Sequence, residues 1–131
     1  MLQTYHGSCH CGALRFRAQI DLSQGSVQCN CSICTKLRWW AVIVPMERFQ
    51  LLSGSAQQSV YTFHRHVEQH YFCAVCGIHP YLRGQSPRWG AFIAVNVACL
   101  DDLDPVALSV LAITELDGRN DCWEAAPSRT A

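Results

Sequence analysis

Three short cysteine clusters constrain this chain more than any other feature of its sequence. They hold seven of its nine cysteines, namely Cys9 and Cys11; Cys29, Cys31 and Cys34; and Cys73 and Cys76. The C-x-C and C-x-x-C spacings let two thiolates reach one metal ion without straining the loop between them. Gly12 and Gly77 directly follow two of the clusters. Glycine permits the positive φ of a tight turn and leaves backbone N–H groups free to bond thiolate sulfur.

Metal binding explains these cysteines better than disulfides do. The segment from Met1 to Cys11 has no basic flank followed by an apolar core, so we expect no secretory signal and a cytoplasmic location. A reducing cytosol disfavours structural disulfides, and an odd number of cysteines does not fit complete internal pairing.

Zinc is the metal that this ligand set favours, because it prefers thiolates in tetrahedral geometry; an iron–sulfur cluster is the alternative. Seven thiolates divide into a closed site of four and an open site of three. Structural zinc is fully ligated and catalytic zinc keeps one position open, so we expect about two zinc ions per chain, one of each kind. If a histidine closes the second site, both ions are structural and the chain is a non-catalytic, zinc-stabilised binding module.

Spacing alone does not say which clusters share an ion. Cys9 and Cys11 can join Cys73 and Cys76, which leaves the middle cluster as an open triplet from one loop. They can instead join Cys29 and Cys31. The first division is simpler, because the compact triplet then has one accessible face.

Length and composition set the remaining limits. The chain has 131 residues, which suits one domain, and half of them are hydrophobic, which is enough for a core. The formal net charge is zero, so we expect no nucleic-acid partner. No apolar run approaches the length of a membrane span. The oligomeric state cannot be inferred from the sequence.

The hydrophobic pattern predicts a mainly β fold. We expect strands at Ala13–Ala18, Trp39–Val44, Arg48–Leu52, Ser59–Phe63, Val67–Phe72, Ala91–Val97 and Ala107–Glu115. The last of these is ambiguous with a short helix, and its β-branched residues favour a strand. His64–His66 is expected to join two strands as a hairpin, and Ser32–Leu37 to form a helical turn within the middle cysteine cluster.

The clusters and their flanks resemble a known family. The matching stretches are Gly7–Phe16, Cys29–Lys36 and Tyr71–Gly77. Together they resemble the glutathione-dependent formaldehyde-activating enzyme family, also called the centromere protein V-type domain. Asn96–Asp101, Leu116–Gly118 and Trp123–Glu124 are more similar to its centromere protein V-like branch. The likeness runs from about Tyr5 to Glu124.

The resemblance implies an Mss4-like fold of several coiled β-sheets, stapled by zinc. We expect one domain over residues 1–125, followed by a frayed tail over 126–131. It implies structural zinc ligands at Cys9, Cys11, Cys73 and Cys76, and catalytic zinc ligands at Cys29, Cys31 and Cys34. The implied activity is that of a carbon–sulfur lyase, which reversibly joins a thiol such as glutathione to formaldehyde. The implied partner is therefore a small-molecule thiol.

Other polar and aromatic residues receive more modest expectations. Lys36 and Arg38 follow the triplet and can attract a substrate carboxylate, although exposed surface charge is the simpler interpretation. We expect at least one of Trp39 and Trp40 to be core, and His10 to point outward. We expect ordinary surface or core histidines at His64, His66, His70 and His79. Cys99 is expected to be a buried, inert thiol, and Cys122 an exposed one.

Overall fold

The computed structural model describes residues 1–64 and 66–120. The predicted tail at 126–131, Cys122 and the Trp123–Glu124 motif lie outside the described residues. The strands are β1 Gln3–Ser8, β2 Arg15–Ile20, β3 Ser26–Cys29, β4 Trp40–Pro45, β5 Phe49–Ser53, β6 Gln58–Tyr61, β7 Gln69–Cys73, β8 Tyr81–Ser86, β9 Gly90–Asn96 and β10 Ile113–Leu116. The helices are α1 Ser32–Leu37 and α2 Pro105–Ser109, with short 3-10 turns at Leu22–Gln24, Met46–Arg48, Ser55–Gln57, Val97–Cys99 and Gly118–Asn120.

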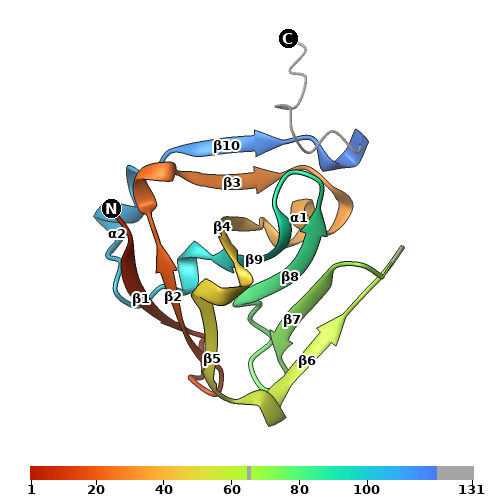
Figure 1. Ribbon diagram of the computed structural model, residues 1–131. Helices are drawn as coiled ribbons and strands as arrows, with labels where there is room; N and C mark the ends of the chain where they lie inside the picture. Colours follow the sequence, from red (N-terminus) through yellow and green to blue (C-terminus); the bar gives the residue numbers. More distant parts are fainter. Residues whose placement is uncertain (65, 121–131) are drawn as a thin grey trace.

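The strands form two sheets, shown in Figure 1. The smaller is antiparallel, with the order β1-β2-β5. The larger has seven strands in the order β10-β3-β4-β9-β8-β7-β6, and only the β10–β3 pair in it is parallel. The mainly β class with several sheets, predicted from the sequence, is therefore confirmed.

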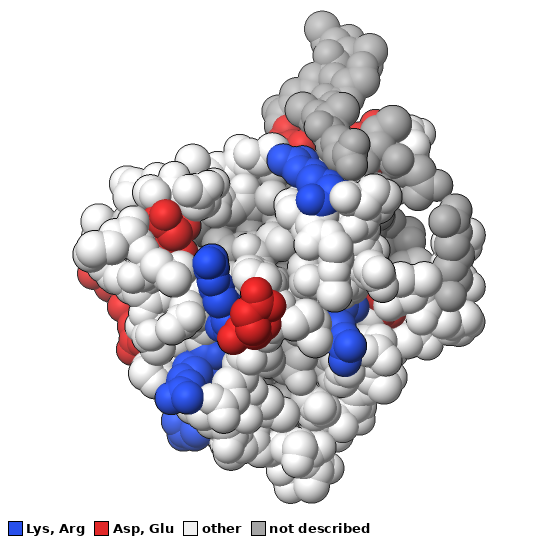
Figure 2. Space-filling model, in the orientation of Figure 1, with Lys and Arg blue, Asp and Glu red and all other residues white. Residues whose placement is uncertain are grey.

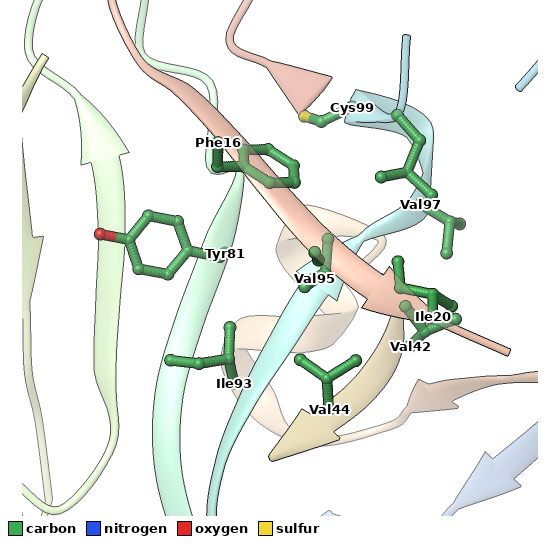
Figure 3. Packing of buried hydrophobic residues seen from close by; sticks show 11 residues of the cluster. Phe16, Ile20, Val42, Val44, Tyr81, Ile93, Val95, Val97 and Cys99 are labelled. Carbon is green, nitrogen blue, oxygen red and sulfur yellow. The ribbon is translucent and has the colours of Figure 1, made fainter. Parts of the chain in front are cut away.

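The main hydrophobic core lies between the two sheets. Phe16, Ala18 and Ile20 alternate with exposed residues along β2 and are at most 2% exposed. They face the larger sheet, as Figure 3 shows. The side chains that meet them there are Val42 and Val44 of β4, Tyr81 of β8, and Ile93 and Val95 of β9. Burial of these β-branched and aromatic side chains holds the sheets together.

The opposite face of the larger sheet carries a second cluster. Ala41, Leu82, Phe92 and Ala94 point to this face, and α1 covers it with Cys34. Trp39, the residue that leads into β4, is buried in the same cluster. In Figure 1, α1 lies beside the larger sheet on the side away from β1, β2 and β5. The middle cysteine cluster therefore belongs to this second face.

Most of the predicted elements are confirmed, with boundaries that shift by at most two residues. The helical turn at Ser32–Leu37 is confirmed as α1, and the predicted hairpin strands pair antiparallel as β6 and β7. The prediction of a strand at Ala107–Glu115 is wrong for the first residues of that segment, which form the last turn of α2. The end of the segment is in β10. Asp104 caps that helix by accepting a hydrogen bond from the Ala107 N–H at 2.8 Å, and Pro105 starts it.

Three strands were not predicted. β1 is polar and mostly exposed, so it lacks the apolar alternation that marks a strand. β3 is short and ends in a cysteine cluster. β8 contains Gly84, where a Cβ would lie 2.6 Å from the Phe92 ring, so the glycine is needed for close packing on β9.

Charged side chains of both signs lie on the described surface (Figure 2). On the face in Figure 2, acidic side chains lie among the basic ones, in keeping with the zero net charge. Among residues 1–64 and 66–120, no helix has the length and apolar character needed to cross a bilayer.

Candidate metal centres

Cys9, Cys11, Cys73 and Cys76 come together as one group whose Sγ atoms all lie within 4.8 Å of one another. The Sγ atoms of Cys9 and Cys11 are 3.7 Å apart, and those of Cys11 and Cys73 are 3.6 Å apart. Four sulfurs at about 2.3 Å from a tetrahedral zinc are about 3.8 Å from one another. The separations therefore fit a zinc tetrathiolate, and this grouping agrees with the first of the two divisions left open by spacing.

Backbone N–H groups point at these sulfurs. Cys9 Sγ accepts from the Leu14 N–H at 3.3 Å, and Cys73 Sγ accepts from the Val75 and Cys76 N–H groups at 3.4 and 3.5 Å. Gly12 and Gly77 have φ of 82° and 80°, as expected for the tight turns that expose such donors. Bonds from the backbone N–H groups of Cys11 and Ile78 lower the pKa of Cys76 to about 6, which favours the thiolate needed for metal binding.

The four-cysteine group joins the two sheets. Cys9 and Cys11 lie in the turn between β1 and β2 of the smaller sheet, whereas Cys73 ends β7 of the larger one. Cys9 and Cys73 are 3% and 0% exposed, and both pack against the fully buried Leu14. A metal here would cross-link the sheets from a buried position, which is typical of a structural site.

Cys29, Cys31 and Cys34 form the second group, again with all Sγ atoms within 4.8 Å of one another. We call this group the triplet. Cys29 is the last residue of β3, Cys31 is the N-cap of α1, and Cys34 is one turn into that helix. A strand end followed at once by a helix start therefore turns the three side chains toward one point. Cys29 and Cys31 are half-buried, while Cys34 is buried.

The triplet already favours a thiolate without a metal. Hydrogen bonds from Cys29 and Cys34 lower the pKa of Cys31 to about 2. These shared hydrogen bonds raise the pKa values of the other two cysteines. The bond between Cys29 and Cys31 raises the pKa of Cys29 to about 11, and the bonds of Cys34 to Cys29 and Cys31 raise the pKa of Cys34 far above its usual value. Three thiols this close hold one negative charge, and a divalent cation would stabilise the charge on all three.

Within the described part of the chain, no fourth Cys, His, Asp or Glu donor joins the triplet at this distance. His10, considered at the sequence level as a ligand, is exposed and belongs to neither group. The two groups therefore differ in the way that a closed and an open zinc site differ, with four donors in one and three in the other.

A polar network that the sequence analysis missed holds the triplet loop from outside. Asn30, between two of the cysteines, donates through Nδ2 to Asp117 Oδ1 at 2.9 Å. Its own Oδ1 accepts from the Arg119 N–H at 3.0 Å, and its carbonyl oxygen accepts from Arg119 Nε and Thr35 Oγ1 at 3.0 Å. The parallel pairing of β10 with β3 brings these distant residues together. The Leu116–Gly118 motif was a signal for Asp117 at the sequence level, but nothing in the sequence identified Asn30 as its partner.

The other residues singled out from the sequence stay outside both groups. Lys36, Arg38, His64 and His66 are exposed. Trp39 is core at 7% exposure, as expected for one of the tryptophans, and Trp40 is partly buried with its Nε1 donating to Ser26 Oγ at 2.7 Å. Cys99 is buried as expected, and burial raises its pKa to about 12, so it remains a thiol.

A cavity of about 530 Å³ lies beside Gly25, Ser26 and Val27, at the end of β3 opposite Cys29. Val27, Ile43 and Trp89 line it, and all three also pack against the cluster that contains Cys34. Arg48 and Arg88 line it as well. Its volume lies within the range of about 300–1,000 Å³ that is typical of small-molecule sites, and its arginines favour an anionic ligand.

Comparison with known proteins agrees with this geometry. The family model described as "Glutathione-dependent formaldehyde-activating enzyme" matches residues 4–113. The crystal structure of a Rhodobacter sphaeroides protein is similar to this chain with a TM-score of 0.71 and 26% sequence identity, covering 83% of this chain and 99% of that one. The family match contains both cysteine groups and ends before Asp117 and Arg119. It does not separate branches of the family, so the nearer likeness to the centromere protein V-like branch stays a prediction.

Proposed function

The chain belongs to the glutathione-dependent formaldehyde-activating enzyme family, and from that membership we propose that it is a zinc-dependent carbon–sulfur lyase. Its substrate would be the adduct of glutathione, or of another small thiol, with formaldehyde or a related carbonyl compound. We propose one domain over residues 1–125 in a cytoplasmic protein, with a structural zinc at Cys9, Cys11, Cys73 and Cys76 and a catalytic zinc at the triplet.

The difference in donor number between the two groups carries this proposal. Three thiolates leave one position of a tetrahedron for a substrate sulfur. Zinc bound at the triplet would supply a Lewis acid that lowers the pKa of a substrate thiol. Cys29, Cys31 and Cys34 would hold that zinc at one fixed place, and their accumulated negative charge would keep a thiolate bound there nucleophilic.

The cavity supports glutathione as the class of thiol. The tripeptide carries two carboxylates at neutral pH, and Arg48 and Arg88 stand in the cavity wall. Val27 is two residues before Cys29 on β3 and points to the same face. A glutathione bound in the cavity would have to extend along β3 past Val27 to bring its sulfur to the triplet.

The alternative is a zinc-stabilised binding module without catalysis. The observation that favours it is the donor set itself, because three thiolates exceed the charge of one zinc ion and weaken its Lewis acidity. A module of this kind would bind two metal ions and leave the exchange of thiol and formaldehyde at its spontaneous rate.

Exchange spectroscopy with ¹³C-labelled formaldehyde and glutathione tests the proposal, because it measures the rate at which the adduct forms and breaks at equilibrium. We expect the zinc-loaded protein to accelerate the exchange, and Cys29→Ser and Cys31→Ser to abolish the acceleration while one zinc and the fold remain. Cys99→Ala is the matched control, since this buried cysteine lies outside both groups. An exchange rate equal to the spontaneous one in zinc-loaded wild-type protein would refute lyase activity.

A further inference from the structure

His70 lies on the face of the larger sheet that carries the triplet. In the antiparallel pairing of β7 with β8 it is directly opposite Leu82, so the two side chains point to the same side. Leu82 packs in the cluster that contains Cys34 and Trp39. The imidazole is therefore a buried polar group on the triplet's side of the sheet.

The imidazole has an unused hydrogen-bonding nitrogen. His70 is 2% exposed. Its Nε2 is buried and has no hydrogen-bond partner among the described residues. A buried polar atom without a partner costs about 1–3 kcal/mol, so its presence calls for an explanation. The Phe63 ring stacks on the imidazole at 5.6 Å between centroids and fixes its plane.

Glu68 lies next to this nitrogen. Its Oε2 is 3.8 Å from His70 Nε2, which is too far for a hydrogen bond but close enough to stabilise an imidazolium. The Glu68 side chain is 35% exposed, so it lies between the buried imidazole and solvent. Burial is the main cause that lowers the pKa of His70, which keeps the ring neutral and able to accept a proton.

Glu68 and His70 both interact electrostatically with Cys31 of the triplet. Burial raises the pKa of Glu68, and the Cys31 thiolate raises it further. The same thiolate opposes the effect of burial at His70. The pKa of His79, which is half-buried and stacks on Phe72 at 5.2 Å, is lowered by burial alone. His70 is nevertheless outside the group of donors within 4.8 Å, so it stands beside the triplet and does not complete it.

We propose that His70 is a catalytic residue whose Nε2 binds the oxygen of the carbonyl substrate and carries the proton between that oxygen and the thiol, with Glu68 stabilising the imidazolium. This inference rests on the proposed lyase function. It accounts for the unpartnered nitrogen, because the oxygen of the adduct is the partner that the empty hydrogen-bonding position would receive.

The proton balance closes on this one residue. In the direction of synthesis, Nε2 takes the proton that the thiol loses. The thiolate sulfur then attacks the carbonyl carbon, the C–S bond forms, the π electrons move to oxygen, and the imidazolium returns the proton to make the hydroxyl. In the reverse direction Nε2 takes the hydroxyl proton as the carbonyl re-forms and the C–S electron pair leaves on sulfur, and the imidazolium then returns the proton to the thiolate. No oxidant or reductant is needed.

Exchange kinetics of His70→Gln, with His66→Gln as the control, tests the proposal. Because general acid–base catalysis contributes about 10²–10⁴-fold, we expect His70→Gln to lower the catalysed exchange rate by about 100-fold or more, with two zinc ions per chain and glutathione binding retained. Glu68→Gln should lower it by a smaller factor. His66→Gln should keep the wild-type rate, since this exposed imidazole bonds to Thr62 Oγ1 and belongs to neither cysteine group.

A second readout does not depend on turnover. In protein with ¹⁵N-labelled histidine, the signal absent from His70→Gln identifies the His70 ring. We expect glutathione with formaldehyde to shift its Nε2 resonance, and S-methylglutathione, which lacks the hydroxyl, to leave it unchanged. An unshifted resonance, or wild-type kinetics in His70→Gln, would overturn the role of His70 while the lyase function stands.

Two further results would also decide against the proposal. If wild-type protein accelerates no exchange, the lyase function and the role of His70 fail together. If His70→Gln loses the zinc of the triplet, the histidine is a metal ligand. The metal, and not the substrate, would then be the partner of its Nε2.

Discussion

Asn30 Nδ2 donates a hydrogen bond to Asp117 Oδ1 at 2.9 Å, linking two residues that are 87 positions apart in the chain. Asp117 is 7% exposed and accepts two further bonds from Asn120 Nδ2, at 3.1 and 2.9 Å. Hydrogen bonds from Asn120 and Asn30 lower the pKa of Asp117, so it stays ionised. The carboxylate therefore fixes the residue between Cys29 and Cys31, although it touches neither sulfur.

Replacing Asp117 should weaken the triplet and spare the four-cysteine group. Mutation of a residue that orients metal ligands typically lowers metal affinity by about 10–100-fold. We expect Asp117→Ala to lower the zinc affinity of the triplet by about this factor and to leave that of the four-cysteine group unchanged. Asp117→Asn keeps an oxygen that accepts from Asn30 and should lose less. Competition with a chelator, followed by counting the zinc that remains, measures both. Loss of both ions at equal chelator concentration would show that Asp117 acts on the whole fold.

The four-cysteine group should be essential for folding. Cys73→Ser removes a fully buried ligand that ties β7 to the turn between β1 and β2. Because binding to a structural zinc contributes directly to folding free energy, we expect this variant to unfold or aggregate. Cys29→Ser should keep a cooperative thermal transition by circular dichroism. A Cys73→Ser variant with a wild-type transition would reverse the roles given to the two groups.

Gly54 should tolerate no side chain, because it packs on the turn that carries Cys9 and Cys11. Its φ is 93°, and a Cβ would lie 2.0 Å from the Ala13 carbonyl oxygen. Gly90 also has a positive φ, 66°, but a Cβ there meets nothing within 4 Å. We expect Gly90→Ala to cost about 1 kcal/mol for backbone strain. Gly54→Ala should cost at least about 2 kcal/mol more, since the clash is with backbone. Urea unfolding measures the difference, and equal costs would rule out a close fit at Gly54.

Zinc binding at the triplet should release protons and weaken in acid. Near neutral pH, Cys31 is already ionised because its pKa is lowered to about 2, whereas the pKa values of Cys29 and Cys34 are raised, so these two must lose protons to bind. We expect about two protons released per zinc at pH 7, and affinity that falls as pH falls because protons compete for sulfur. Calorimetry in buffers of different ionisation enthalpy, on protein with the four-cysteine group already loaded, counts them. Affinity that is independent of pH would contradict thiolate ligation.

The cysteine groups were predictable because metal ligands at short spacing are a local signal. The seven residues and the helical turn at Ser32–Leu37 follow from motifs and periodicity within a few residues. The division into four and three was not fixed by spacing, since it depends on which loops the sheets bring together. It became an expectation through the family resemblance, and the structure agrees with it.

The parts that were missed depend on long-range pairing. Asp117 reaches Asn30 only because β10 runs parallel to β3, and His70 lies on the triplet's side of the sheet only because β7 pairs with β8 in one register. As isolated residues in the sequence, they do not differ from ordinary surface or core residues. The Ala107–Glu115 strand failed for a local reason: the cap at Asp104 and Pro105 outweighs the β-branched composition that follows.

A crystal structure of the zinc-loaded protein soaked with glutathione tests the central claim most directly, because it shows every ligand of the triplet's metal. We predict zinc bound by Cys29, Cys31 and Cys34, with the glutathione sulfur as fourth ligand at about 2.3 Å. A fourth protein side chain on that zinc, or a triplet without metal while the four-cysteine group is loaded, would contradict an open catalytic site.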